Sequence, residues 1–226
     1  MSNVLMTMKN IITFVILAFF CSSFQDQWKN VYTESAWKDR DRWQRANDLI
    51  RAAGIKSGSY VADIGSHEGY MTFKLSTVVG ESGRVYAVDV DQHKLDKLAE
   101  IAKTRKVMNI ATLKGDYDDP KLPPNSLDAA IILDTYHEMK QHDTVLAHVK
   151  AALRNGGSLV ICEPIADERR ALTRIEQEGK HELGIAFAVE DLMKAGFKIL
   201  RREDPFVDRT QEKGDKMWLL VAVKPK

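Results

Sequence analysis

A glycine-bounded turn follows a short apolar run and carries groups that could hold a nucleotide. The stretch reads Val61-Ala62-Asp63-Ile64-Gly65-Ser66-His67-Glu68-Gly69-Tyr70, and an amphipathic segment follows it. This order predicts a strand, a tight turn and a helix. Glycine allows a sharp bend and a close ligand approach, and the helix offers free N–H groups and the positive end of its dipole. Such a turn after the first strand of an α/β sheet is a nucleotide-binding place.

A second polar cluster follows a run that reads as a fully buried parallel strand, Leu127–Leu133. The cluster is Asp134-Thr135-Tyr136-His137-Glu138-Met139. Ligands of open α/β sheets bind beyond the carboxyl ends of the strands, so we expect this cluster at the mouth of the same crevice. His137 and Glu138 have pKa ranges suited to polarising or deprotonating an acceptor. Alternatively, they cap the following helix or hold the loop.

The predicted second strand, Arg84–Asp89, also ends in an acid. Asp89 lies 20 residues after Gly69. In α/β nucleotide folds an acid at that spacing hydrogen-bonds the ribose hydroxyls, because a carboxylate can accept from both. The alternative is an ordinary acid at a strand end. Asp91 is expected to cap the next helix.

The first turn resembles motif I of the class I S-adenosylmethionine-dependent methyltransferases, D/E-x-G-x-G-x-G. Asp63, Gly65 and Gly69 match it, whereas His67 stands where the family has its middle glycine. The resemblance implies that Asp63 engages the amino group of the methionine moiety. It also implies that the turn, including Ser66, makes room for the ribose and the amino-acid portion. The side chain of His67 could narrow this pocket or add a hydrogen bond.

Two later stretches fit the same family in chain order. Gly115-Asp116 follows a short predicted strand, Ala111–Lys114, and the resemblance implies that Asp116 accepts from the adenine amino group. Tyr117, the next residue, could stack on the adenine or shield it. The cluster from Asp134 resembles motif IV, especially the N/D-x-x-H-H pattern of small-molecule and quinone-type methyltransferases, with Glu138 in place of the second histidine. Asp134 is accordingly expected on the cofactor side.

The family resemblance covers about residues 36–224. Asn155-Gly156-Gly157 precedes a predicted fifth strand, Ser158–Cys162, and two final strands, Lys198–Glu203 and Lys216–Val223, form a closing hairpin. The expected fold is a Rossmann-like α/β sheet with order 3-2-1-4-5-7-6, its last strand antiparallel and helices on both faces. The expected domain is 59–226, preceded by a helical cap at 24–58.

The cap is rich in aromatic residues, and its apolar residues recur at helical spacing up to Gly54. It could pack on the sheet edge, or it could form a lid that brings Trp43 and Gln44 near the cofactor. Trp43 of this cap and Tyr136 of the cluster after the predicted fourth strand are candidate acceptor-binding residues. Arg169 is a third candidate from the charged stretch 166–182, whose simplest interpretation is a solvated face.

The N-terminus predicts a secretory signal peptide over residues 1–23, with translation starting at Met8. A lysine precedes ten apolar or near-apolar residues, Ile11–Phe20, and small residues follow. Ten residues are too few for a mature membrane span. The expected destination is the bacterial periplasm, with only transient membrane contact. A lipoprotein at Cys21 and an uncleaved anchor are the alternatives.

The predicted function is methyl transfer from S-adenosylmethionine to a small-molecule acceptor by direct in-line displacement. The alternative is an exported, catalytically degenerate binding protein of the same fold. A nicotinamide dehydrogenase is disfavoured because G-x-G-x-x-G is absent. The 33 basic and 32 acidic residues imply no bulk attraction to nucleic acid. No metal site is predicted, and a monomer or homodimer is expected.

Overall fold

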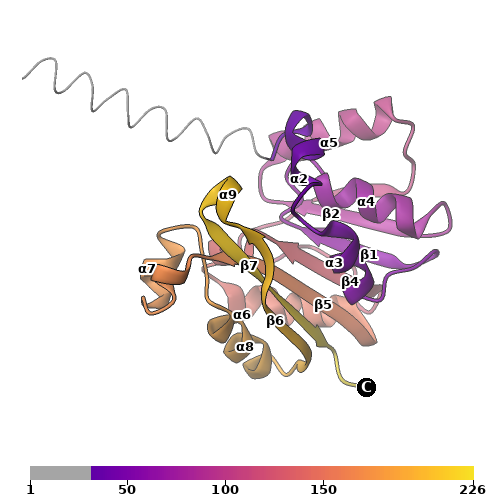
Figure 1. Cartoon of the computed structure of the whole chain (residues 1–226). Coiled ribbons are helices and arrows are strands. Elements are labelled where there is room, and N and C mark those ends of the chain that lie inside the picture. The colour runs from indigo at the N-terminus through magenta and orange to yellow at the C-terminus, as the bar shows by residue number, and fades with distance from the viewer. Residues whose placement is uncertain (1–31) are drawn as a thin grey trace, which may run out of the picture.

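The structure is a computed structural model that describes residues 32–226 (Figure 1). The predicted signal peptide and the first residues of the predicted cap lie outside the described residues. Within residues 32–226, no helix combines the length and the apolar character needed to cross a membrane.

A seven-stranded sheet forms the centre of the protein, and its order is β3-β2-β1-β4-β5-β7-β6. β1 to β5 are mutually parallel, whereas β7 runs antiparallel to both β5 and β6. The order and the antiparallel final strand are therefore as predicted. The strands are β1 Tyr60–Ile64, β2 Arg84–Asp89, β3 Ile110–Lys114, β4 Leu127–Leu133, β5 Leu153–Ile165, β6 Lys198–Arg209 and β7 Asp215–Val223.

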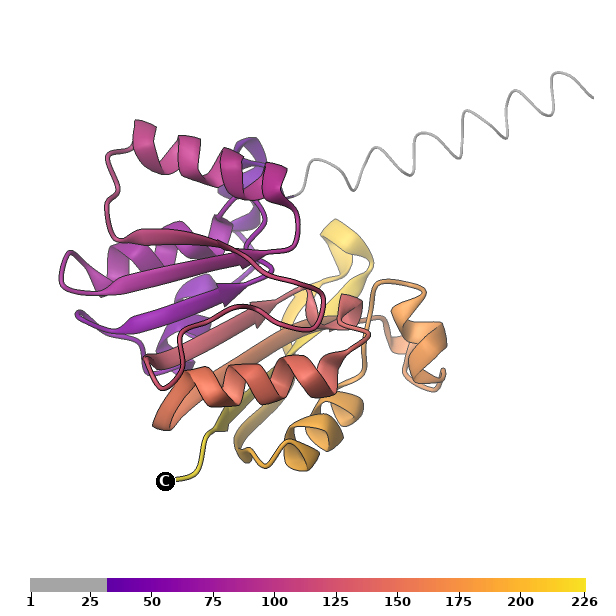
Figure 2. The same ribbon diagram turned by 180° about the vertical axis from the view of Figure 1, so that it is seen from behind.

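Helices cover both faces of the sheet (Figures 1 and 2). α3, α4 and α5 contribute to one apolar cluster, and α6 and α8 contribute to the other. The α-helices are α2 Trp37–Arg40, α3 Ala46–Ala52, α4 Tyr70–Val79, α5 Gln92–Thr104, α6 His142–Ala152, α7 Arg174–Glu178, α8 Ile185–Lys194 and α9 Thr210–Lys213. Three 3₁₀ turns accompany them: η1 Glu34–Ala36, η2 Tyr136–Glu138 and η3 Asp167–Arg169.

The central strands supply side chains to both cores because successive residues of a strand face opposite sides. Val61 and Ile131 pack in the first cluster, whereas Ala62 and Ile132 pack in the second. Each of these side chains is fully buried. This double-sided burial explains why β1 and β4 read as continuous apolar runs. It also fixes where their polar carboxyl ends emerge.

The closing hairpin is longer than predicted. β6 continues past the predicted end at Glu203 as far as Arg209, with an irregular register between Glu203 and Val207. α9 then forms the turn, and Gly214 closes it in the left-handed conformation. The extra length carries Arg209 and Lys213 to the carboxyl ends of the parallel strands. Sequence periodicity does not reveal this extension, because a polar stretch at a sheet edge lacks an apolar pattern.

Candidate functional site

A cleft of about 940 Å³ opens at the carboxyl ends of β1, β2 and β4. Most of the predicted site residues line it: Asp63, Gly65, Ser66, His67, Asp89, Asp116, Tyr117, Asp134, His137, Glu138 and Arg169. Residues that were not predicted also line it, among them Tyr32, Arg40, Arg209 and Lys213. Three predicted residues, Gly69, Trp43 and Tyr136, are absent from its lining.

Gly65 is required by both backbone conformation and space. Its φ is +80°, a region that other residues rarely adopt, and an added Cβ would lie 2.3 Å from Thr135 Cγ2. The turn therefore approaches the end of β4 closely. Gly69 has a different role from the one predicted. It precedes α4 at φ +103°, where an added Cβ would meet Phe73 at 2.9 Å, so it starts the helix rather than lining the cleft.

His67 takes a left-handed backbone conformation, which is uncommon for a residue with a side chain. Its φ is +48°, and its backbone N–H donates to Asp89 Oδ2 at 2.8 Å. Its ring lies 5.5 Å from the Tyr32 ring. Nδ1 of His67 and the hydroxyl of Ser66 are buried without a hydrogen-bond partner among the described residues. Burial lowers the pKa of His67 to about 4, so the ring is neutral at neutral pH.

Asp63 is wholly enclosed at the end of β1. The Thr72 hydroxyl donates to its Oδ2 at 2.5 Å. Burial nevertheless raises the pKa of Asp63 to about 6, because desolvation outweighs the hydrogen bond and the nearby charge of Arg40. Asp63 is thus an acid whose charge depends on what enters the cleft beside it.

Asp89 organises the turn on the ribose side of the predicted site. Besides the N–H of His67 it accepts the N–H of Asp91, through Oδ1, at 2.9 Å. Each carboxylate oxygen can accept a further bond, so Asp89 remains able to bind a ligand. Asp116 lies at the rim and forms an ion pair with Lys121 at 3.0 Å. Tyr117 beside it is 77% exposed, which leaves its ring available for stacking.

A buried ionic network closes the opposite wall of the cleft. The Arg209 guanidinium, only 1% exposed, donates to Asp134 at 3.0 Å and to Asp215 at 2.5 Å. The Tyr32 hydroxyl donates to Asp134 at 3.1 Å. Burial opposes ionisation of Asp134, but Arg209 and Lys213 hold its pKa well below the usual range. Asp134 is therefore ionised at neutral pH and already paired.

Arg40 from α2 is a cleft residue that the sequence interpretation missed. Its side chain is 6% exposed, its Nε donates to Gln44 Oε1 at 3.0 Å, and its guanidinium lies 4.3 Å from the centre of the Tyr70 ring. The predicted lid residue Trp43 instead packs against the apolar core, with Arg209 5.5 Å from its ring. Of the cap residues, Arg40 thus lines the cleft and Trp43 does not, and the lid stays a prediction.

The η2 turn orients His137 and Tyr136 in different directions. The Tyr136 side chain is fully buried, and its hydroxyl donates to Asp191 at 2.9 Å, so it does not face the cleft as predicted. His137 Nδ1 lies 2.5 Å from Oε2 of the fully buried Glu163. Burial disfavours the charged imidazole, but the Glu163 carboxylate prevails and raises the pKa of His137 to about 10. A ring that carries its proton at neutral pH is a poor general base.

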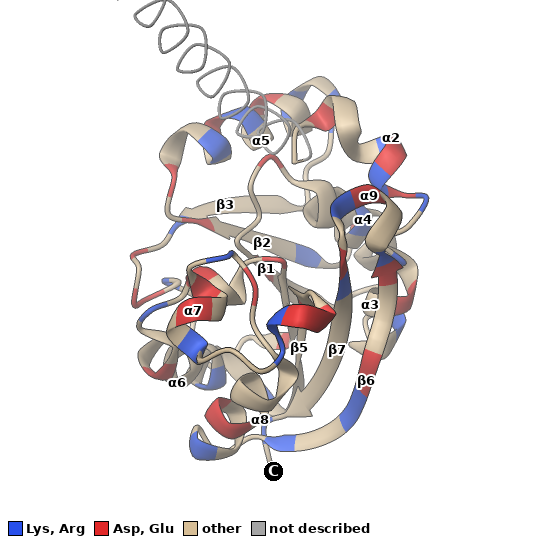
Figure 3. Cartoon of the chain, turned by 60° about the vertical axis from the view of Figure 1, so that its left-hand side comes forward, with Lys and Arg blue, Asp and Glu red and all other residues tan. Residues whose placement is uncertain are grey.

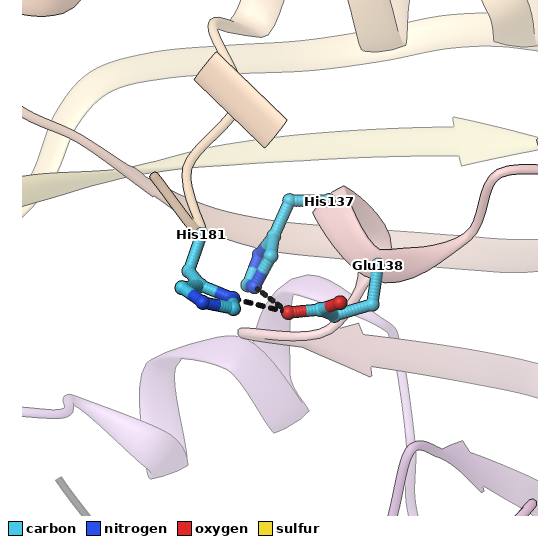
Figure 4. Close-up of side chains that lie close together, drawn as sticks. All are labelled: His137, Glu138 and His181. Atoms are coloured by element: carbon cyan, nitrogen blue, oxygen red, sulfur yellow. Dashed lines mark hydrogen bonds and ion pairs between the residues drawn. The ribbon is translucent and has the colours of Figure 1, made fainter. Parts of the chain in front are cut away.

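Glu138 bridges His137 to His181, which comes from the loop after α7 (Figure 4). Glu138 Oε1 lies 3.4 Å from His137 Nε2 and 2.5 Å from His181 Nδ1. His137 lowers the pKa of Glu138 to about 2, mainly through their hydrogen bond. Arg169 lines the cleft nearby and donates to Glu182 at 2.6 Å. Residues of both charges occur along α7 and β6 (Figure 3).

Residues 61–157 match the family model described as a methyltransferase domain. The chain is similar to the ubiquinone/menaquinone biosynthesis C-methyltransferase UbiE of Saccharophagus degradans, with 29% identity over 118 residues, 50% of this chain and 46% of that protein. It is also similar to the Psychromonas ingrahamii UbiE protein, with 25% identity over 126 residues, 54% of this chain and 48% of that protein. The chain thus spans about half the length of these curated relatives.

Solved structures have the same fold. A SAM-dependent methyltransferase from Aquifex aeolicus superimposes with a TM-score of 0.67 at 24% identity, covering 79% of this chain and 88% of that one. Haemonchus contortus phosphoethanolamine N-methyltransferase 2, in complex with S-adenosyl-L-methionine, gives 0.66 at 16% identity, covering 88% and 59%. The [4+2]-cyclase SpnF gives 0.68 at 17% identity, covering 80% and 81%. A similar fold therefore does not by itself identify the reaction.

Proposed function

We propose that this chain, a member of the class I S-adenosylmethionine-dependent methyltransferase family, transfers the methyl group of S-adenosylmethionine to a small-molecule acceptor in this cleft. One observation carries the proposal. Ser66 and His67 of the first turn line the cleft, and Ser66 Oγ and His67 Nδ1 are buried with no hydrogen-bond partner among the described residues. Buried polar groups are normally hydrogen-bonded, so a polar ligand is the expected partner.

The cofactor would lie across the carboxyl ends of β1 and β2. Asp89 would accept from the ribose hydroxyls, and Asp116 would accept from the adenine amino group while Tyr117 stacks on the ring. Asp63 would face the ammonium of the methionine portion, whose charge favours the ionised carboxylate. Arg40 lies close enough to Asp63 to influence its ionisation. We assign the methionine carboxylate to Arg40, because a guanidinium matches a carboxylate in charge and geometry.

Methyl transfer needs alignment more than it needs acid–base chemistry. The sulfonium already makes its methyl carbon electrophilic, so the acceptor atom has only to lie in line with the breaking carbon–sulfur bond. His67 suits this role because its low pKa keeps the ring neutral beside a cationic cofactor. The acceptor would approach from the side of Arg169, Lys180 and His181, which follow β5 and line the other part of the cleft.

Calorimetry of S-adenosylmethionine and S-adenosylhomocysteine with the full chain tests the cofactor assignment. We expect micromolar binding that Asp89→Asn weakens about 10- to 100-fold, because a hydrogen bond to a charged group contributes about 1.5–3 kcal/mol. Asp96→Asn, which changes an exposed acid of α5 bonded to Gln92, is the matched control and should bind normally. Absence of binding up to millimolar ligand would refute the proposal. Where the cofactor binds, an assay of methyl transfer to phenolic or quinol acceptors would distinguish an enzyme from the binding-protein alternative.

Export from the cytosol is a separate proposal. It depends on the basic start, apolar run and small residues of positions 8–23. N-terminal sequencing of the mature protein would test it, since an intact Met1 or Met8 contradicts cleavage.

A further inference from the structure

We propose that His137, Glu138 and His181 form a binding site for a divalent transition metal such as Zn²⁺ in the acceptor part of the cleft. One nitrogen from each histidine and one carboxylate oxygen lie within 4.8 Å of one another. All three side chains line the cleft (Figure 4). Two imidazoles and one carboxylate are a donor set that suits zinc and other first-row metals.

The spacing suits a metal after a small adjustment. Bonds of 2.0–2.2 Å at tetrahedral angles place ligand atoms about 3.3 Å apart. His137 Nε2 and Glu138 Oε1 are already 3.4 Å apart. His181 Nδ1 is closer to that oxygen, at 2.5 Å, and would have to move away by somewhat less than 1 Å. The side chains of His181 and Glu138 are 76% and 55% exposed, so both are free to rotate.

The buried histidine is already oriented for ligation. Glu163 Oε2 holds His137 Nδ1 at 2.5 Å, which directs Nε2 toward Glu138. Glu163 is itself fixed, because it accepts the backbone N–H groups of Thr135 at 2.6 Å and Tyr136 at 2.9 Å. A carboxylate behind the ligating imidazole is a common arrangement at protein metal sites, where it fixes the ring and raises its basicity. The metal would take the place of the proton on Nε2.

The loop that carries His181 is also held in place. Glu182, the next residue, accepts the backbone N–H of Ala166 at 3.1 Å and an N–H of Arg169 at 2.6 Å. The buried Gln177 accepts the backbone N–H of Gly184 at 2.7 Å. His181 itself has a φ of +58°, so the loop maintains an uncommon conformation that presents this ring to the cleft. The loop thus fixes the backbone of His181, while its exposed side chain can still adjust its position.

A second group of three possible ligands serves as an internal comparison. His142, Asp143 and Asp191 also lie within 4.8 Å of one another. Asp191, however, accepts two bonds from Arg174, at 2.8 and 3.0 Å, and one from Tyr136 at 2.9 Å. A carboxylate already bound by a guanidinium is a poor metal ligand, so this second cluster is structural.

If the proposed function holds, a metal at this site would restrict the acceptor to compounds that can bind the metal. A tetrahedral ion with three protein ligands has one open position, so the acceptor would offer a hydroxyl to fill it. Its hydroxyl would coordinate and release its proton to solvent. The oxygen's electron pair would then form the O–CH₃ bond, while the electrons of the breaking carbon–sulfur bond pass to sulfur and give S-adenosylhomocysteine.

Calorimetric titration of the chelator-treated full chain with Zn²⁺ tests the site. We expect one Zn²⁺ per chain in the wild type, and binding weakened at least about 10-fold in Glu138→Gln and in His181→Ala. His148→Ala removes another exposed histidine, on α6, and should bind like the wild type. Equal Zn²⁺ affinity in all four proteins, or no stoichiometric binding in the wild type, would overturn the proposal.

S-adenosylhomocysteine is titrated into the same preparations, with and without Zn²⁺. Cofactor binding without Zn²⁺ binding would overturn the metal site and leave the methyltransferase proposal intact. Zn²⁺ binding without cofactor binding would support the site and contradict the proposed function.

Discussion

Arg40→Met should weaken binding of S-adenosylmethionine while leaving the nucleoside half of the cofactor unaffected. Arg40 is 6% exposed and lies beside Asp63 in the cleft. Methionine is an unbranched side chain that removes the charge, together with the guanidinium that lies over the Tyr70 ring. If Arg40 binds the methionine carboxylate, the change removes charge-assisted hydrogen bonds worth about 1.5–3 kcal/mol. This corresponds to a 10- to 150-fold higher Kd, using about 1.4 kcal/mol per factor of ten.

Decarboxylated S-adenosylmethionine provides the decisive comparison, because it retains the ammonium, sulfonium, ribose and adenine and lacks only the carboxylate. The wild type should prefer the complete cofactor, and Arg40→Met should lose most of that preference. The two ligands and two proteins form a double-difference cycle, in which a general loss of stability cancels. Calorimetry supplies the four affinities, and thermal melting checks that the variant is folded.

Arg42→Met is the matched control, since Arg42 lies two residues away and its side chain is 75% exposed beside Asp39. It should change neither affinity. The reasoning would be refuted if Arg40→Met weakened both ligands equally, because Arg40 would then act only by shaping the cleft. Undiminished affinity for S-adenosylmethionine would exclude Arg40 from the site altogether.

Three further predictions concern the strand ends. The pKa of Asp63 is raised to about 6, so its carboxyl group becomes ionised as the pH increases through 6. The calorimetric affinity for S-adenosylhomocysteine should rise over the same pH range, and Asp63→Asn should flatten this profile. Gly65→Ala and Gly156→Ala both place alanine at φ +80°, but only the alanine at position 65 clashes with Thr135. In urea unfolding, Gly156→Ala should lower the free energy of unfolding by about 1–2 kcal/mol and Gly65→Ala should lower it further. Equal losses would contradict the clash. Glu163→Gln should lose about 2–4 kcal/mol in the same assay, because buried N–H groups lose a charged acceptor; an unchanged midpoint would mean that the turn does not depend on that charge.

The sheet order could be predicted because each strand leaves a local signal. β1 and β4 are buried on both faces and read as apolar runs, and a polar group follows each of β1, β2, β3 and β4 at its carboxyl end. Parallel strands bring those ends together at one edge of the sheet. Asp63, Asp89 and Asp134 could therefore be assigned to one cleft from chain order alone. Their hydrogen-bond partners could not be assigned in this way.

The errors in the predicted site come from features without a local signal. The cap consists of separate short helices, because α2 ends at Arg40 and α3 begins only after Arg45, which adopts φ +52°. Arg40 lines the cleft, and no apolar pattern indicates this. Tyr136 and His137 are adjacent, yet one 3₁₀ turn buries the first against Asp191 and directs the second to Glu163. Arg209 reaches Asp134 from 75 residues away, through a hairpin whose polar strand gave no apolar pattern.

The replacement of the middle motif I glycine by His67 does not close the cleft. The backbone keeps the left-handed conformation that glycine would adopt, at a cost of about 1–2 kcal/mol for a side chain. The ring turns toward Tyr32, and the backbone N–H of His67 donates to Asp89. Tyr32 in turn donates to Asp134, at the carboxyl end of β4. Through its contact with Tyr32, His67 thus connects the carboxyl ends of β1 and β4, a link that a glycine at this position could not make.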